Sequence, residues 1–187
     1  VNVLGSFRIN SGGQALSDAA TEKARALLTF LAYEGAQPRT TLSALLWPYL
    51  PQEAASDNLR KTLYRLRQRL EESIPSIADP FIASRQSVQL DPHSITVDAM
   101  RFQSLLAECH QHAHKELAGC DGCLVRLAYA IDLYQGELLA GFGLSDAPAF
   151  EEWLLLSREI LQQQALFALA TLTTAWEARG DFARAYA

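Results

Sequence analysis

The spacing of apolar residues changes several times along the chain, and each change predicts a different element. The odd-numbered positions from Val1 to Ile9 alternate with mostly polar ones, which is typical of a half-buried strand. A turn at 11–13 follows. From Thr21 the apolar residues recur every three or four positions, which predicts a helix that begins with Thr21 as N-cap and ends at Gly35.

Two more helices are predicted before residue 75. The first begins at Thr40 or Thr41 and ends at the Trp-Pro pair 47–48. The second runs from about 54 to 72, because its leucines at 59, 63, 66 and 70 are spaced four, three and four. At 100° per residue these leucines share one side of the helix. The opposite side then carries polar and charged residues: Asp57, Asn58, Lys61, Tyr64, Arg65 and Gln68.

After these helices the apolar residues again alternate with polar ones, and from residue 98 onward their spacing is helical. Short β-type runs at 81–84 and 88–90 flank Arg85 and predict a hairpin with Arg85 at its tip. Asp98 is an expected N-cap, followed by helices at about 99–112, 122–135 and 148–178 and a further start at Asp181. The fold class is therefore mainly α with small β, and the change at residue 96 predicts a first domain at 1–96 and a second at 97–187.

Charge is distributed unevenly between these two parts. The 187 residues carry 16 Lys and Arg against 21 Asp and Glu, a net charge of −5 that gives no indication of nucleic-acid binding. Residues 1–96 hold ten cations and nine anions, however, and 97–187 hold six and twelve. Between Arg39 and Arg69 there are six cations and two anions, a local basic stripe suited to a phosphate backbone.

Several stretches of sequence resemble the antibiotic-regulatory (SARP) class of bacterial transcriptional activators. They are 23–32 (KARALLTFLA), 45–48 (LLWP) and 58–67 (NLRKTLYRLR) in the first part. In the second part, 133–142 (LYQGELLAGF) and 150–154 (FEEWL) resemble the bacterial transcriptional activator domain, and 180–187 resembles the turn and second helix of a tetratricopeptide repeat that is cut short. The resemblance implies an N-terminal winged helix-turn-helix followed by an all-α, tetratricopeptide-like array.

The resemblance also assigns roles to residues of the first part. The helix at about 54–72 is implied to be the recognition helix in the major groove of promoter DNA, supported by the preceding helix. The N-terminus of that preceding helix suits a phosphate, and Arg85 would touch a neighbouring groove. The expected DNA-binding residues are Arg39, Thr40, Thr41, Asn58, Lys61, Tyr64, Arg65, Gln68 and Arg85. The alternative is that a charged face opposite a leucine stripe is plain solvated surface.

A second chemical signal is a cluster of cysteines and histidines at 109–123. It contains all three cysteines and three of the four histidines. Four of the five candidates Cys109, His112, His114, Cys120 and Cys123 would suit a structural zinc ion, since Cys-x2-Cys and Cys-x2-His present ligands from tight turns. Two alternatives stay open: buried core cysteines beside a polar loop, or a redox pair of Cys120 and Cys123.

No enzyme motif accompanies these features. The sequence has no phosphate-binding GxxxxGK[ST] loop, no GxGxxG after a strand and no GxSxG. It has no apolar run long enough to cross a membrane and no signal-peptide pattern, so we expect a cytoplasmic protein that is not an enzyme and requires no cofactor. Expected partners are promoter DNA, a second copy on direct repeats, and RNA polymerase or a sensory or ATPase region. The alternative function is a protein-interaction scaffold whose winged helix no longer binds DNA.

Overall fold

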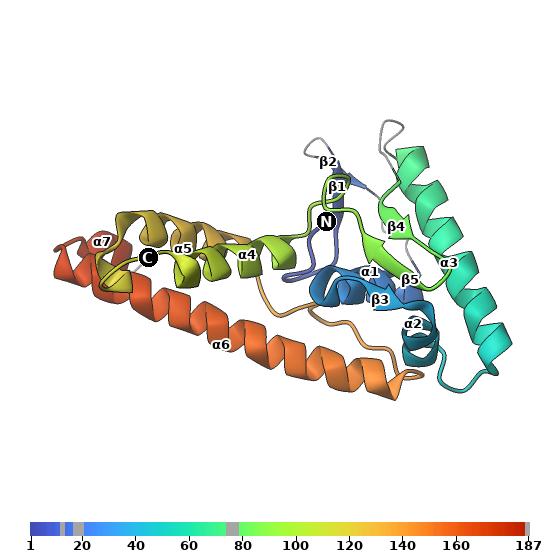
Figure 1. Ribbon diagram of the computed structural model, residues 1–187. Coiled ribbons are helices and arrows are strands. Elements are labelled where there is room, and N and C mark those ends of the chain that lie inside the picture. The colour runs from blue at the N-terminus through green and yellow to red at the C-terminus, as the bar shows by residue number, and fades with distance from the viewer. Residues whose placement is uncertain (12–13, 17–20, 74–78, 186–187) are drawn as a thin grey trace.

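The computed structural model describes residues 1–11, 14–16, 21–73 and 79–185, and this part of the chain is mainly helical (Figure 1). Its helices are α1 (Glu22–Glu34), α2 (Arg39–Leu46), α3 (Gln52–Ser73), α4 (Asp98–Gln111), α5 (Asp121–Leu133), α6 (Pro148–Ala178) and α7 (Phe182–Ala185), with a 3-10 turn η1 at Leu117–Gly119. The strands are β1 (Ile9–Ser11), β2 (Gln14–Leu16), β3 (Gln37–Pro38), β4 (Phe81–Ala83) and β5 (Ser87–Leu90). The expected mainly helical class with a small β component is confirmed.

The N-terminal segment differs from the single strand predicted at 1–9. The chain folds back at Gly5, where φ is +104°, so that Asn2 pairs with Arg8 and Leu4 pairs with Leu138. Val3 and Leu4 are both buried, which no alternating strand allows. Regular pairing begins only at β1, which lies antiparallel to β2 with Ser11 opposite Gln14. Residues 12–13 of the expected turn lie outside the described residues.

The helices of the first part follow the predicted pattern closely. The Thr21 side chain accepts the amide of Ala24 and caps α1, and Gly35 with φ +71° ends it. α2 and α3 each begin one or two residues earlier than expected. The four leucines of α3 and Ala55 are buried, so the predicted leucine stripe is the side of α3 that packs into the core.

A three-stranded antiparallel sheet lies beside these helices in the order β3-β5-β4. Gln37 of β3 is opposite Val88, and Phe81 of β4 is opposite Leu90. The hairpin β4–β5 was predicted; β3, only two residues long and containing Pro38, was not. β3 precedes α2 directly, so it fixes the start of α2 against the sheet.

One hydrophobic core joins the two parts of the chain. It runs from Val3 through the leucines of α3 to Ala175 in α6. α6 runs from beside α7 to a position beneath α1 and α2, and α3 lies beyond its N-terminal end (Figure 1). There Trp153 of α6 packs on Phe30 at a ring-centroid distance of 4.8 Å, and its indole N–H donates to Glu34 at 2.7 Å. The division at residue 96 stays a prediction, but the two parts do not pack independently.

Asp98 is not the N-cap of α4 but its first residue. Its buried carboxylate accepts the amides of Val3, Leu4 and Ala99 at 2.8–3.1 Å, and so fixes the N-terminal segment to α4. In the described ranges, none of the helices is sufficiently long and apolar to cross a bilayer.

Candidate nucleic-acid interface and Cys/His cluster

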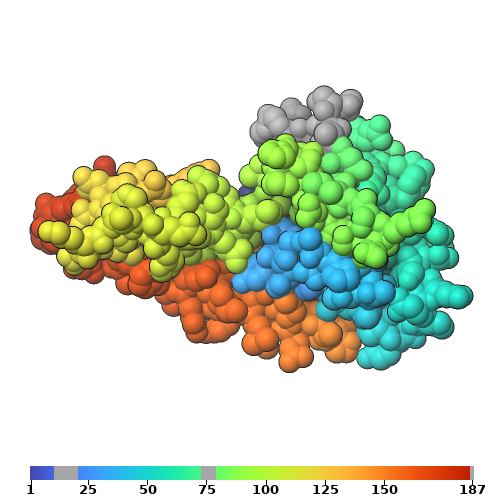
Figure 2. Space-filling view, viewed as in Figure 1, coloured from blue at the N-terminus to red at the C-terminus, as the bar shows by residue number. Residues whose placement is uncertain are grey.

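The polar side of α3 lies at one end of the molecule and is open to solvent. The space-filling view shows α3, in teal to green, along that open flank (Figure 2). Lys61, Tyr64, Arg65 and Gln68 are exposed and Asn58 is half-buried. We call these five residues the outer face of α3. They lie opposite the buried leucines, as the angular argument predicts.

The charges near this face divide into paired and free groups. Arg60 pairs with Asp57 at 3.0 Å, and Arg67 pairs with Asp79 at 2.9 Å. Within the described ranges, Lys61 and Arg65 have no hydrogen-bond or ionic partner. Two cations on the outer face therefore remain available to an anionic partner.

Side-chain hydrogen bonds fix α2 against the beginning of α3. The Gln52 amide group donates to Ser43 of α2 at 3.1 Å and to Ser56 of α3 at 3.2 Å. Ser43 is fully buried and its hydroxyl donates to the carbonyl of Thr40. Sequence reasoning did not identify Gln52, and its position directly after a proline was the only local signal. The bridge sets the crossing of the two helices.

The strands β4 and β5 are joined by the three residues 84–86, which lie beside the start of α2. The Ser84 hydroxyl accepts the amides of Gln86 at 3.1 Å and Ser87 at 2.9 Å, which holds Arg85 exposed at the tip. Arg39 donates from Nε to the carbonyl of Ser84 at 2.9 Å, so its side chain joins α2 to the hairpin. Thr40 and Thr41 are exposed in the first turn of α2. All nine expected DNA-binding residues thus lie on α2, α3 or the hairpin.

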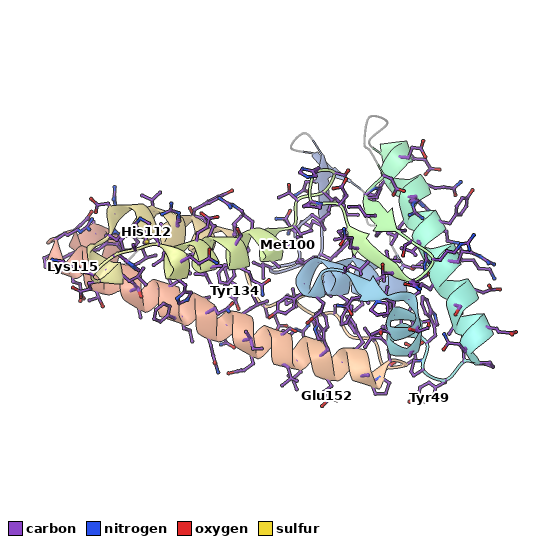
Figure 3. All side chains as sticks on the ribbon, viewed as in Figure 1. Tyr49, Met100, His112, Lys115, Tyr134 and Glu152 are labelled. Carbon is purple, nitrogen blue, oxygen red and sulfur yellow. The ribbon has the colours of Figure 1, made fainter. Side chains whose placement is uncertain are left out.

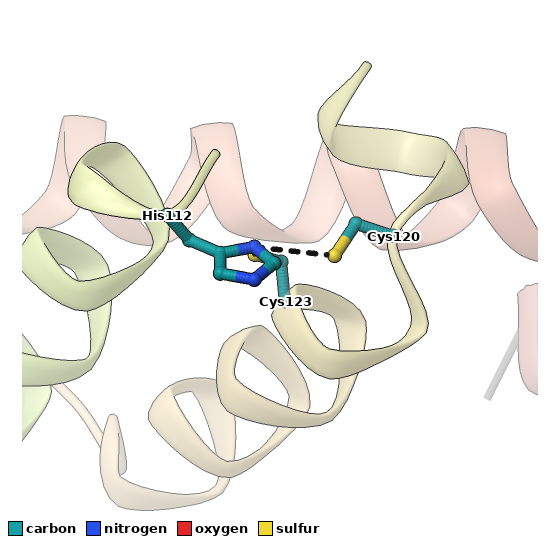
Figure 4. A group of neighbouring side chains, drawn as sticks. All are labelled: His112, Cys120 and Cys123. Carbon is teal, nitrogen blue, oxygen red and sulfur yellow. Dashed lines mark hydrogen bonds between the residues drawn. The ribbon is translucent and has the colours of Figure 1, made fainter. Parts of the chain in front are cut away.

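A second candidate site lies near the opposite end of the molecule, where His112 is labelled in Figure 3. There His112, Cys120 and Cys123 place one ligand atom each within 4.8 Å of one another, an arrangement that can hold a metal ion (Figure 4). Nδ1 of His112 is 3.5 Å from Sγ of Cys120 and 3.4 Å from Sγ of Cys123. We call these three residues the Cys/His cluster.

The other two candidate ligands, Cys109 and His114, do not belong to this cluster. Cys109 is buried in the core and its thiol donates to the carbonyl of Cys123 at 3.6 Å, so the expectation of a buried core cysteine fits this residue. The imidazole rings of His112 and His114 lie 5.7 Å apart. Nε2 of His114 is buried and has no hydrogen-bond partner among the described residues.

The two thiols of the cluster differ in their electrostatics. Cys120 is the N-cap residue of α5, and the backbone amide of Cys123 lowers the pKa of its thiol. Burial raises the pKa of the Cys123 thiol to about 12. Cys-x2-Cys at the beginning of a helix also occurs in redox sites, but here the 3-10 turn η1 precedes it instead of a strand.

Comparison with known proteins gives similarity in fold only. No protein-family model matches the chain, and no curated protein matches it in sequence. A solved structure of Mycobacterium tuberculosis EmbR in complex with a low-affinity phosphopeptide is similar, with a TM-score of 0.68 and 20% sequence identity. The match covers 96% of this chain and 46% of the EmbR chain, so this chain spans about half the length of that protein.

Proposed function

We propose that the chain is a sequence-specific DNA-binding transcriptional regulator of SARP type. In this proposal residues 1–96 form a winged helix-turn-helix and α3 enters the major groove. The observation that carries it is the outer face of α3. There Lys61 and Arg65, cations without a partner among the described residues, lie beside Asn58 and Gln68 on the side opposite the core. Cations suit phosphates, and Arg, Asn and Gln can make paired hydrogen bonds to base edges.

The elements around α3 support the same docking. The order α1, β3, α2, α3, β4, β5 is that of a winged helix, and α2 crosses behind α3 as a supporting helix. Thr40 and Thr41 would contact phosphate at the start of α2, and Arg85 would reach a neighbouring groove from the hairpin tip. Arg39 would contribute a guanidinium that the hairpin carbonyl of Ser84 already orients.

The helical remainder, 97–187, is proposed to be a tetratricopeptide-like domain that makes protein contacts. Its net charge of −6 disfavours DNA. Large apolar residues are exposed on the outer side of α6, and such patches are typical of protein contacts. The proposed partners are promoter DNA bound as direct repeats by two copies, and RNA polymerase or a sensory or ATPase region. The protein is further proposed to be cytoplasmic and not an enzyme.

Binding to a genome-derived oligonucleotide pool tests this function and yields the operator. The whole chain is used, because a 1–96 fragment would lose the core contacts with α4 and α6. The variant is Lys61→Ala with Arg65→Ala. The matched control is Lys115→Ala, an exposed lysine at the opposite end of the molecule (Figure 3).

We expect selective binding to DNA. The logarithm of the binding constant should fall linearly with the logarithm of the salt concentration, with a slope of about −0.9 per phosphate neutralised. The double variant should lose at least about 30-fold in affinity, since each contact contributes about 1–3 kcal/mol, and Lys115→Ala should change little. No selection over random DNA, or unchanged binding by the double variant, would contradict the proposal and favour the protein-interaction scaffold.

A further inference from the structure

We propose that His112, His114, Cys120 and Cys123 bind one structural zinc ion that joins the end of α4 to the beginning of α5. This site is independent of DNA binding and lies near the opposite end of the molecule from α3 (Figures 1 and 3).

The distances in the Cys/His cluster match a tetrahedral zinc site. Zinc binds thiolate sulfur at about 2.3 Å and imidazole nitrogen at about 2.0–2.1 Å, which at a tetrahedral angle separates the two ligand atoms by about 3.6 Å. The observed separations from Nδ1 of His112 are 3.5 Å to Cys120 and 3.4 Å to Cys123. Both nitrogen–sulfur separations therefore fit a common ion, and the two sulfur atoms lie within 4.8 Å of each other.

Rigid elements hold these three ligands in place. His112 directly follows the last residue of α4, Cys120 is the N-cap of α5 and Cys123 lies in its first turn. The thiol of Cys109 supports the turn from behind, through its contact with the Cys123 carbonyl. His112 is exposed and Cys123 buried, so an ion would enter from the solvent side. Only the loop between His112 and Cys120 remains to be fixed by the ion.

The fourth ligand is His114 and not Cys109. Nε2 of His114 is buried without a hydrogen-bond partner among the described residues, which costs free energy that coordination would recover. The ring of His114 already lies 5.7 Å from that of His112. Cys109, in contrast, is occupied by the Cys123 carbonyl and by the core. The ligand pattern is therefore His-x-His-x5-Cys-x2-Cys.

The donor set selects zinc over the hard cations. Two thiolates and two imidazoles are the ligands of structural zinc, whereas Mg²⁺ and Ca²⁺ require oxygen ligands. Within the described ranges, the cluster includes no carboxylate. Four protein ligands leave no open position for water, so the ion would stabilise the α4–α5 pair and would not be catalytic.

The test uses the whole chain purified without chelator. Its zinc content is measured, the metal is then removed under reducing conditions, and cobalt(II) is titrated as a spectroscopic probe. We expect one equivalent of zinc per chain. We also expect a visible cobalt spectrum typical of tetrahedral sites, together with a near-ultraviolet thiolate-to-cobalt band.

Variants then assign the individual ligands. Cys120→Ser and Cys123→Ser should each reduce the thiolate-to-cobalt band. His114→Ala should weaken binding by more than the roughly 10- to 100-fold that loss of an outer-shell partner costs. His110→Ala is the matched control, because this exposed histidine two residues before His112 stacks on Phe167 and lies outside the cluster. It should bind cobalt like the parent chain, and Cys109→Ala should also retain the metal.

Three results would overturn the inference. Reduced protein that binds neither zinc nor cobalt would do so, and a Cys120–Cys123 disulfide in that protein would identify a redox pair instead. Unchanged metal binding by Cys120→Ser or Cys123→Ser would show that the substituted cysteine is not a ligand. Loss of metal in Cys109→Ala with full retention in His114→Ala would exclude His114 as the fourth ligand.

Discussion

The two long helices α3 and α6 bury apolar rows of the same spacing, but their solvent-facing sides differ in chemistry. Each buries a row of apolar residues spaced three and four apart in one common core, represented by Leu63 in α3 and Leu161 in α6. Outside, α3 presents its polar and cationic outer face. The outer side of α6 instead exposes large apolar residues: Leu155, Leu156, Ile160, Leu166, Phe167 and Leu169. We call these six the outer side of α6.

This difference separates what determines the fold from what determines the partner. Either buried row would satisfy the core, because burial depends on apolar spacing and volume. The outer faces contribute little to stability, yet they present different chemistry to other molecules. Hydrogen-bond donors and cations fit a nucleic acid, and an apolar patch fits protein. The comparison therefore predicts that inner substitutions affect folding and outer substitutions affect binding.

Truncating the buried rows should have the largest effect. Leu63→Ala in α3 and Leu161→Ala in α6 should each lower the free energy of unfolding by about 2–5 kcal/mol, since both side chains are almost fully buried. Urea denaturation followed by circular dichroism measures the loss. Because both rows belong to one core, each variant should still unfold in a single transition.

If Leu63→Ala produced two separate transitions, with the α4–α6 region unfolding later, the predicted domains 1–96 and 97–187 would be energetically independent. The contacts of Trp153 with Phe30 and Glu34 would then contribute little to coupling.

Asp98 makes the stability of the same core depend on pH. Burial raises the pKa of its carboxyl above the ordinary value of 3.8 and outweighs the hydrogen bonds from the amides of Val3, Leu4 and Ala99, which lower it. The folded state therefore binds the proton more tightly than the unfolded state. The contribution of Asp98 to the free energy of unfolding is therefore complete below pH 3.8, the ordinary pKa, and is lost as pH rises through the folded-state pKa.

Asp98→Asn isolates this contribution. The stability advantage of the parent chain over the variant should be greatest in acid and should shrink as pH rises, in urea midpoints measured from pH 3 to 7 at roughly constant ionic strength. The pKa of Glu108 is lowered, so its contribution to stability is lost as pH falls. This contribution is the same in the parent chain and the variant, and it cancels in the difference between them. An advantage that grew with pH would show that the amides outweigh burial.

The sequence predicts those features that local chemistry determines. Pro148 at the first position of α6 and Gly180 beyond its end mark a helix that the structure reproduces at Pro148–Ala178. The Thr21 cap and the α3 leucine row are equally local. Cys120 and Cys123 lie together because their spacing is short.

Features that depend on distant partners could not be predicted in this way. Asp98 reads as an N-cap, but its carboxylate accepts amides 94 and 95 residues away. β3 exists because Gln37 pairs with Val88, and the first strand fails because Leu4 is buried against Leu138. Among the metal candidates, the sequence could not decide which of Cys109, His112 and His114 stays free of the metal. The packing of α4 on α5 separates the candidates into a cluster, a core cysteine and His114, whose Nε2 has no partner among the described residues.

A smaller effect should come from Tyr64 on the outer face of α3. Its hydroxyl accepts the Gln68 amide group at 2.8 Å and has no other hydrogen-bond partner in the part of the chain that the structure describes, so it can contact a phosphate. Tyr64→Phe should weaken DNA binding by about 0.5–1.5 kcal/mol, the net contribution of one hydrogen bond. Stability should change by less than about 0.5 kcal/mol, because Tyr64 is 58% exposed. Fluorescence anisotropy on the selected operator measures the first change, and urea denaturation the second.

The smallest effect on folding and on DNA should come from the outer side of α6. Replacing Leu155 and Leu166 by glutamine leaves the charge unchanged, and both side chains are more than half exposed. Stability should therefore stay within about 0.5 kcal/mol per site, and the affinity of a single chain for one half-site should not change. Self-association, measured by sedimentation equilibrium, should weaken if a second copy covers this side. A loss of half-site affinity in this variant, with self-association intact, would contradict the comparison directly, since DNA would then contact the apolar helix as well as the cationic one.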